Sequence, residues 1–151
     1  MANAETELPL LAARLKAAGA VGVRAEMVAG LKAAAKPMVP KLQESARNSL
    51  PKAGGLNEYV AKRKPKVSVR TTGRTAGVRI RSQVKGNYTN TGTWRHPVFG
   101  RRANPEDWAE ETYEPAAGWW DRVVKADDGE TKAAAVAVLK TVAAQVQRLG
   151  I

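Results

Sequence analysis

The chain has 151 residues, no cysteine and a formal net charge of +11. A domain of this length buries roughly 70% of its unfolded surface, so it needs no covalent cross-link to fold. The absence of cysteine excludes disulfide scaffolds, thiolate zinc sites, thiol catalysis and redox switching, and it fits a reducing cytoplasm or a particle assembled there.

Many of the hydrophobic residues are small, because 27 of the 66 are alanine. The core of the fold is therefore expected to be thin. Two explanations stay open at this point, namely burial against partner subunits and close packing of alanine-rich helices.

The charge is unevenly distributed along the chain. Residues 1–35 carry a net charge of +1, residues 36–102 carry +14 and residues 103–151 carry −4. A section at +14 repels itself, so we expect it to meet nucleic acid or an acidic surface on another subunit, for which the acidic section is a candidate. The sequence has no apolar run near the roughly 20 residues of a membrane span and no secretion signal at its start, so we expect a soluble protein without membrane contact.

The first third of the chain is predicted to be helical. Apolar residues recur there at helical spacing in two sets, and each set forms one stripe of a helix. Residues 18–22 contain two glycines, each of which weakens a helix by about 1 kcal/mol relative to alanine, and they predict a break. Pro37 and Pro40 predict a kink in the second helix or its restart, and Pro51 predicts its end. The two stripes are Leu8, Leu11 and Leu15, then Val28, Leu31, Ala35, Met38 and Leu42.

The middle of the chain is predicted to be rich in β-structure. After a short amphipathic stretch over residues 56–61, the hydrophobic period changes to two, which predicts a hairpin over residues 67–81. One face of this hairpin is apolar, whereas the other carries Arg70, Arg79 and Arg81 and must stay hydrated or contact an anion. Residues 86–92 are predicted to form an exposed loop, and residues 93–99 a further strand or extended segment.

A C-terminal helix is predicted, capped by Asp127 or Asp128 and stopped at Gly150. We expect the whole chain, residues 1–151, to form one α+β domain in which kinked N-terminal helices and the C-terminal helix pack on a small antiparallel β-sheet with long loops. Residues 5–50 are helical in this prediction, residues 64–115 are β-rich and residues 118–150 are helical. The buried stripe of the last helix is Leu139, Val142, Val146 and Leu149.

The sequence does not predict an enzyme. His96 is the only histidine, and no Gly-x-Ser-x-Gly turn, Walker loop or dinucleotide-binding glycine loop is present. One acidic cluster could supply oxygen ligands, but its spacing matches no calcium loop, and such a run usually forms a solvated face. We therefore expect no catalytic residue, cofactor or metal. The acidic cluster is Glu106, Asp107, Glu110, Glu111 and Glu114.

The sharpest basic run has three open interpretations. The favoured interpretation is a solvated loop that leads into the first strand. The other two are contact with an acidic protein partner and binding of nucleic-acid phosphates. The run has no interleaved aromatic residue for base stacking, so nucleic-acid binding would act through phosphates and fall steeply with salt. Its members are Lys62, Arg63, Lys64 and Lys66.

Seven of the eight aromatic residues lie between residues 88 and 120. A second small core beneath a long connection would explain Trp94, Phe99 and Trp108, and a subunit interface is the alternative. Trp119 and Trp120 are adjacent and cannot both point into one core, so we expect one of them to face a partner.

The segment Gly92-Thr93-Trp94-Arg95-His96-Pro97-Val98-Phe99-Gly100, followed by Trp108 and then by Pro115 with Gly118-Trp119-Trp120, resembles the neck proteins of long-tailed bacteriophages (siphophages). The likeness runs from about residue 22 to residue 149, and its specific part is residues 92–120. It implies a structural α+β subunit of a ring, commonly a hexamer, that lies between the head-closure (stopper) ring and the tail terminator or tail tube. Members of this family are called tail-completion, minor tail or head-to-tail connector proteins. They are assembled in the host cytoplasm, belong to the neck of the virion and let genome DNA pass through their channel.

A channel must let DNA slide, and neutralising about 6 phosphates per subunit would already change the affinity about a thousandfold with modest changes in salt. We therefore expect the basic section to face neighbouring subunits or the outside, opposed by the acidic section across a head-to-tail interface. Tail completion is the favoured station, and a basic nucleic-acid-binding module acting through phosphate contacts is the alternative function. The candidate interface residues are Trp94, His96, Phe99, Trp108, Trp119, Trp120, Arg70, Arg79 and Arg81.

Overall fold

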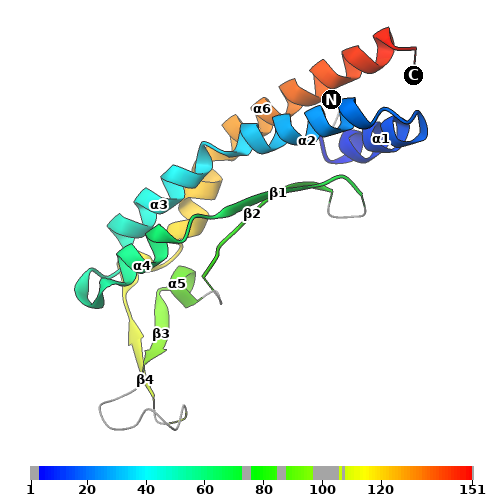
Figure 1. Cartoon of the computed structure of the whole chain (residues 1–151). Coiled ribbons are helices and arrows are strands. Elements are labelled where there is room, and N and C mark those ends of the chain that lie inside the picture. Colours follow the sequence, from blue (N-terminus) through cyan, green and yellow to red (C-terminus); the bar gives the residue numbers. More distant parts are fainter. Residues whose placement is uncertain (1–3, 73–75, 85–87, 97–105, 107, 151) are drawn as a thin grey trace. The chain divides into compact units, whose positions relative to one another are not determined.

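The computed structural model describes residues 4–72, 76–84, 88–96, 106 and 108–150 (Figure 1). It is 67% helical with two small antiparallel sheets, which confirms the predicted α+β fold class. The elements are α1 (Ala4–Ala17), α2 (Val21–Ala35), α3 (Met38–Ser49), η1 (Ala53–Gly55), α4 (Leu56–Lys62), β1 (Lys66–Arg70), β2 (Gly77–Arg81), α5 (Tyr88–Thr91), β3 (Thr93–His96), β4 (Ala109–Thr112), η3 (Glu114–Ala116) and α6 (Trp119–Arg148).

Contacts within the chain divide it into two compact units. Unit 1 comprises residues 1–39, 65–81 and 127–151, and unit 2 comprises residues 40–64 and 82–126. Helix α6 therefore supplies residues 119–126 to unit 2 and its remaining residues to unit 1. That the chain is a single domain stays a prediction.

Unit 1 is built around a cluster contributed by three helices. Leucines and a methionine from α1 and α2 pack there against the buried stripe of α6, as the helical spacing predicted. The β1–β2 hairpin runs alongside α1 and α2 (Figure 1), and its cross-strand neighbours Val69 and Val78 pack against the same cluster. The cluster comprises Leu8, Ala12, Leu15, Met27, Leu31, Leu139, Val142 and Val146.

Two positions of the predicted stripes are wrong. Met27 is fully buried in α2, whereas Val28 is only half-buried. Both residues lie at helical spacing from Leu31, so the period alone could not decide between them. Leu149 is 59% exposed, because the cluster that buries the stripe ends at Val146 and α6 stops at Arg148.

The predicted helix breaks are confirmed. Helix α1 ends at Ala17 and α2 begins at Val21, so the glycine-containing segment separates them. Helix α2 ends at Ala35 and α3 begins at Met38, so the chain restarts a helix near Pro37 rather than kinking one.

Two predictions about the second half of the chain are wrong. Helix α6 begins at Trp119, so Asp127 and Asp128 lie inside it and do not cap it. Its first turn is held instead by Asn90, whose Oδ1 accepts a hydrogen bond from the backbone N–H of Trp120 at 2.9 Å. The segment predicted as an exposed loop forms the helical turn α5 over residues 88–91, which places Asn90 for this contact, and Gly92 after it is buried. Residues 85–87 lie outside the described part of the chain.

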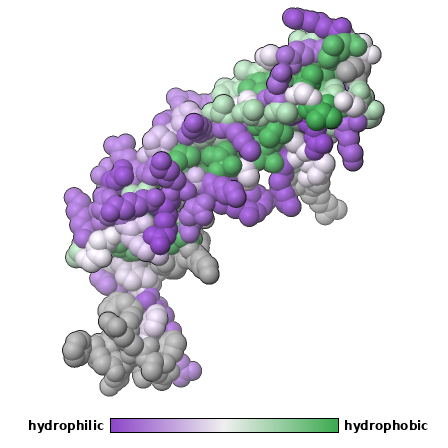
Figure 2. Space-filling model, in the orientation of Figure 1, coloured by the Kyte–Doolittle hydropathy of each residue, from purple (hydrophilic) through white to green (hydrophobic). Residues whose placement is uncertain are grey.

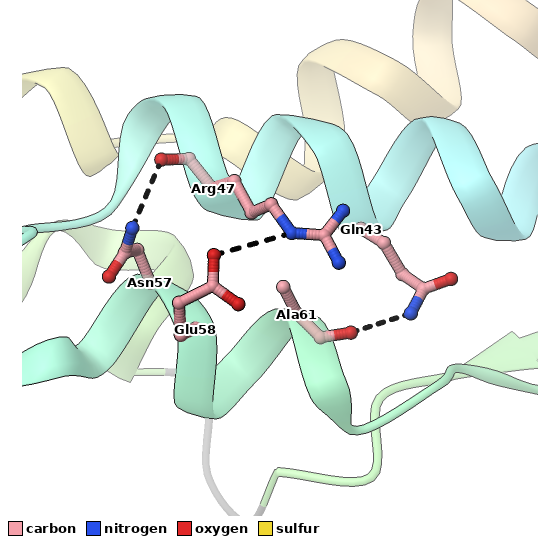
Figure 3. A network of polar contacts seen from close by, with 5 residues as sticks. All are labelled: Gln43, Arg47, Asn57, Glu58 and Ala61. Carbon is pink, nitrogen blue, oxygen red and sulfur yellow. Dashed lines mark hydrogen bonds and ion pairs between the residues drawn. The ribbon is translucent and has the colours of Figure 1, made fainter.

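In unit 2, polar contacts join α3 to α4 (Figure 3). Gln43 Nε2 donates to the carbonyl of Ala61 at 2.6 Å, and Asn57 Nδ2 donates to the carbonyl of Arg47 at 3.5 Å. Each accepting carbonyl lies in the last turn of its helix, where the helix supplies no donor. An ion pair between Arg47 Nε and Glu58 Oε1 at 3.4 Å lies between them. The end of α4, from which the basic run begins, is thus fixed to α3.

Candidate subunit interface

The β1–β2 hairpin presents one cationic face. Its register pairs Lys66 with Arg81 and Ser68 with Arg79, and cross-strand partners share a face of the sheet. Arg70 lies on the same face opposite Gly77, while the valines and Ile80 lie on the other face. The predicted division into an apolar and a basic face is therefore confirmed. Neither strand contains an acidic residue, and like charges directly opposite each other destabilise a hairpin unless a counter-charge comes from elsewhere.

The basic run begins at the last residue of α4 and is exposed. Lys62, Arg63, Lys64 and Lys66 are all solvent-exposed. The guanidinium carbon of Arg63 lies 3.6 Å from the centroid of the Tyr59 ring, and its Nη1 donates to the Tyr59 carbonyl at 3.3 Å. The run itself has no interleaved aromatic residue, but sequence reasoning missed its contact with Tyr59, whose signal is the spacing of four residues at the end of a helix.

An acidic block follows the basic section in the sequence. Residues 59–105 contain twelve basic and no acidic residues, whereas residues 106–121 contain six acidic and no basic residues. Glu110 lies in β4 opposite Arg95, so these two side chains share a face of the strand pair, and strand alternation places Tyr113, just after β4, on the other face. Glu110 and Glu114 are exposed, and Tyr113 is 37% exposed.

Hydrogen bonds fix the segment that follows β4. The N–H of Tyr113 donates to the Gly92 carbonyl at 2.7 Å, and the Tyr113 carbonyl accepts from the N–H of Ala116 at 3.0 Å. The guanidinium of Arg122 donates to the carbonyls of Pro115, at 3.0 Å, and Ala117. These contacts tie the end of β4 and η3 to the first turn of α6.

Trp94 and Trp108, which the sequence suggested for a small core or an interface, are brought together. Both are half-buried and line a pocket of about 740 Å³ with Pro51 and Leu56. The indole N–H of Trp108 is buried and has no hydrogen-bond partner among the described residues. His96 ends β3 opposite Ala109, while its side chain and the whole of Phe99 lie outside what the structure describes.

The two adjacent tryptophans differ in exposure. Trp119 is 3% exposed, whereas Trp120 is half-buried. Their rings meet edge to face, with centroids 5.6 Å apart and planes at 87°. Trp119 is therefore an interior residue of unit 2, and of the pair only Trp120 offers surface to a partner.

Sequence reasoning missed a groove between α1 and α6. It has a volume of about 270 Å³ and lies in unit 1, where Figure 2 shows hydrophobic surface gathered over the helices. Leu10 on its edge is 66% exposed. The available signal was that Leu10 is apolar yet lies off the stripe that Leu8, Leu11 and Leu15 form. The groove is lined by Leu10, Leu11, Arg14, Leu139, Lys140 and Ala143.

Within the described residues, no group of three or more acidic or histidine side chains is placed to hold a metal ion. Nor does that part of the chain contain a helix both long and apolar enough to cross a membrane. No protein-family model, curated protein or solved structure matches the chain.

Proposed function

We propose that the chain is a structural subunit of the head–tail connector of a long-tailed bacteriophage. In this proposal it forms the tail-completion ring, commonly of six copies, between the head-closure ring and the tail terminator or tail tube, and it catalyses no reaction. Genome DNA passes through the channel without specific binding.

The observation that carries this proposal is the sorting of charge into a basic and an acidic section, the basic one with a cationic hairpin face. The cationic hairpin face, with half-buried Arg79 and exposed Arg81, contains no acidic residue, while Glu110 and Glu114 are exposed in the acidic block. A chain with two different complementary surfaces associates head to tail, and rotation by a fixed angle closes such contacts into a ring. The resemblance of residues 92–120 to phage neck proteins supports the same function.

The test is assembly on the neighbouring ring. We expect the chain, followed by light scattering at low and high salt, to form rings alone or on the head-closure protein, and less so at high salt because screening weakens the contacts. The variant Arg79→Glu/Arg81→Glu should weaken assembly. The matched control Lys32→Glu/Lys36→Glu makes the same change in net charge at exposed positions of α2 and at its end, and it should assemble normally.

Two outcomes would refute the proposal. One is a chain that stays monomeric in the presence of the head-closure ring. The other is an Arg79→Glu/Arg81→Glu variant that assembles normally but loses binding to DNA, because the hairpin face would then be a DNA site.

The alternative function, a basic nucleic-acid-binding module, is favoured by the contact of Arg63 with Tyr59. This pair adds an exposed aromatic and a stacked guanidinium to the basic run, which are the groups that bind single strands. If this function holds, Lys62→Gln/Lys64→Gln should reduce the slope of log K against log salt by about 2, and the chain should bind DNA as a monomer.

A further inference from the structure

The pocket of unit 2 combines an indole ring with a carboxylate. Trp94 and Glu111 are cross-strand partners in the β3–β4 pair, so their side chains share one face of the strands. Trp94 is half-buried and Glu111 is exposed, while Pro51 and Leu56 add apolar lining. An indole face and a carboxylate both attract a cation. The volume of about 740 Å³ lies within the range of roughly 300–1,000 Å³ typical of binding pockets, so a long side chain can enter.

Arg95 also lines this pocket, but it is held by its own chain. Its Nη2 donates to the carbonyls of Glu106 and Trp108 at 3.1 and 3.2 Å. Glu110 lies directly opposite Arg95, on the other face of the strand pair from Trp94, and Glu111 follows it in β4. Carboxylates therefore outnumber this guanidinium, and the site still favours an incoming cation.

The cationic hairpin face has no counter-charge within its own strands. Arg81 is exposed at the end of β2 and lies directly opposite Lys66, and Arg79 lies two residues earlier on the same face. Like charges that face each other across a hairpin destabilise it, so an added carboxylate relieves this repulsion. The planar guanidinium of arginine stacks on an indole ring while it pairs with a carboxylate. Arg81 therefore has the chemistry that the pocket binds.

We propose that the pocket of one copy binds Arg81 from the hairpin of the next copy. The guanidinium stacks on the Trp94 indole and pairs with the Glu111 carboxylate. This contact rests on the proposed function, because it names the residues that join adjacent subunits of the ring. Pocket and hairpin are different surfaces of one chain, so each contact leaves a free pocket at one end and a free hairpin at the other, and it propagates until the ring closes.

Charge reversal on each side tests the ion pair. Glu111→Arg or Arg81→Glu alone sets like charges against each other, and the concentration for half-maximal assembly on the head-closure protein should rise about tenfold. The double variant Glu111→Arg/Arg81→Glu restores the attraction in every contact and should recover most of the loss. The matched control is Glu26→Arg/Arg81→Glu, which has the same net charge but carries its new arginine at an exposed position of α2. It should assemble as weakly as Arg81→Glu.

Conservative substitutions test the stacking. Arg81→Lys keeps the charge but loses the planar group, and Trp94→Leu keeps an apolar side chain but removes the aromatic face. Each should raise the half-maximal concentration about 2- to 30-fold. Their double variant should be little worse than either single variant, because both remove the same interaction. Arg79→Lys, on the same hairpin face, is the control and should stay near the wild type. Circular dichroism checks that every variant folds.

Cysteine trapping tests the pairing directly, because the chain has no cysteine of its own. Ala53→Cys, at an exposed position lining the pocket, and Lys66→Cys, opposite Arg81, are introduced into separate chains. When the two chains are mixed on the head-closure protein under mild oxidation, a disulfide should join one to the other. Lys32→Cys on α2 replaces Lys66→Cys in the control, which should give no such link.

The outcomes separate this contact from the proposed function. Wild-type rings with normal assembly of Glu111→Arg, or without the disulfide link, would place the subunit contact elsewhere and leave the ring function standing. Loss of assembly in both single reversals with no recovery in the double variant would show that Glu111 and Arg81 do not meet. A wild-type chain that never joins the head-closure ring would overturn the ring function and this contact together.

Discussion

Replacing Gly92 by alanine should destabilise unit 2 more than the same change at any open glycine. Gly92 has φ of +74°, in the left-handed region that favours glycine. A Cβ placed there would lie 2.9 Å from both the Ala117 nitrogen and the Tyr113 oxygen. Both are backbone atoms held by hydrogen bonds, so neither can move aside at little cost.

The size of the effect follows from two contributions. The left-handed conformation costs alanine about 1–2 kcal/mol, and overpacking against fixed atoms costs about 1–3 kcal/mol more. Gly54 is the matched control, since it has the same φ of +74° and a Cβ there would meet nothing within 4 Å. Gly54→Ala should therefore show the first cost alone, and Gly92→Ala the sum of about 2–5 kcal/mol.

Tryptophan fluorescence is the appropriate assay, because all four tryptophans belong to unit 2. The free energy of unfolding is measured for both variants by denaturant titration, and the melting temperature by heating. For a chain of this size 1 kcal/mol corresponds to about 2–4 °C, so Gly92→Ala should melt roughly 2–12 °C below Gly54→Ala. If the two variants melt within about a degree of each other, the tight contact at Gly92 does not constrain the fold.

Three further substitutions or measurements test the packing. Asn90→Ala removes the acceptor for the Trp120 N–H and should cost unit 2 about 0.5–2 kcal/mol, whereas Asn90→Asp keeps an acceptor but repels Asp121 and should fall between alanine and wild type in the same titration. Gly30→Ala would place a Cβ 2.8 Å from Val138 Cγ1. The gain of about 1 kcal/mol in helix propensity should be outweighed by overpacking against the stiff Val138 side chain. In the double variant Gly30→Ala/Val138→Ala, the two substitutions should couple favourably by at least about 0.5 kcal/mol in the free energy of unfolding, measured by circular dichroism. Thermal unfolding followed by fluorescence and by circular dichroism should give one coincident transition if the chain is a single domain, and separated transitions would show that the units unfold independently.

The sequence predicted those parts of the fold that local spacing decides. The periods of 3.6 and 2 located the helices of unit 1 and the two faces of the β1–β2 hairpin, because each period is a property of neighbouring residues. The start of α6 could not be read in this way. Its first turn is held by Asn90, about thirty residues earlier, and a capping residue so far from its helix leaves no local pattern.

The candidate interface was predictable in its charge but not in its geometry. The basic and acidic sections are visible in the composition, and alternation placed Arg70, Arg79 and Arg81 on one face. The groove forms because α1 lies beside α6, and the lining residues of the two helices are more than a hundred positions apart in the sequence. The sequence therefore indicated the groove only through Leu10, an apolar residue outside the buried stripe of its helix. The sequence showed only that the adjacent side chains of Trp119 and Trp120 must differ in exposure. Which of the two is exposed depends on tertiary contacts.

A contact between neighbouring subunits through exposed charged side chains should be weak by itself and strong only in a ring. A few exposed ion pairs do not outweigh the loss of translational and rotational freedom, which costs about 4–15 kcal/mol. A subunit held on the head-closure ring meets its neighbour at an effective concentration in the millimolar range, and the last subunit makes two contacts at once. We therefore expect the chain to assemble steeply with concentration, and at lower concentration on the head-closure protein than alone, as measured by light scattering. Independent, non-cooperative filling of sites on that protein would show that neighbouring copies do not contact each other.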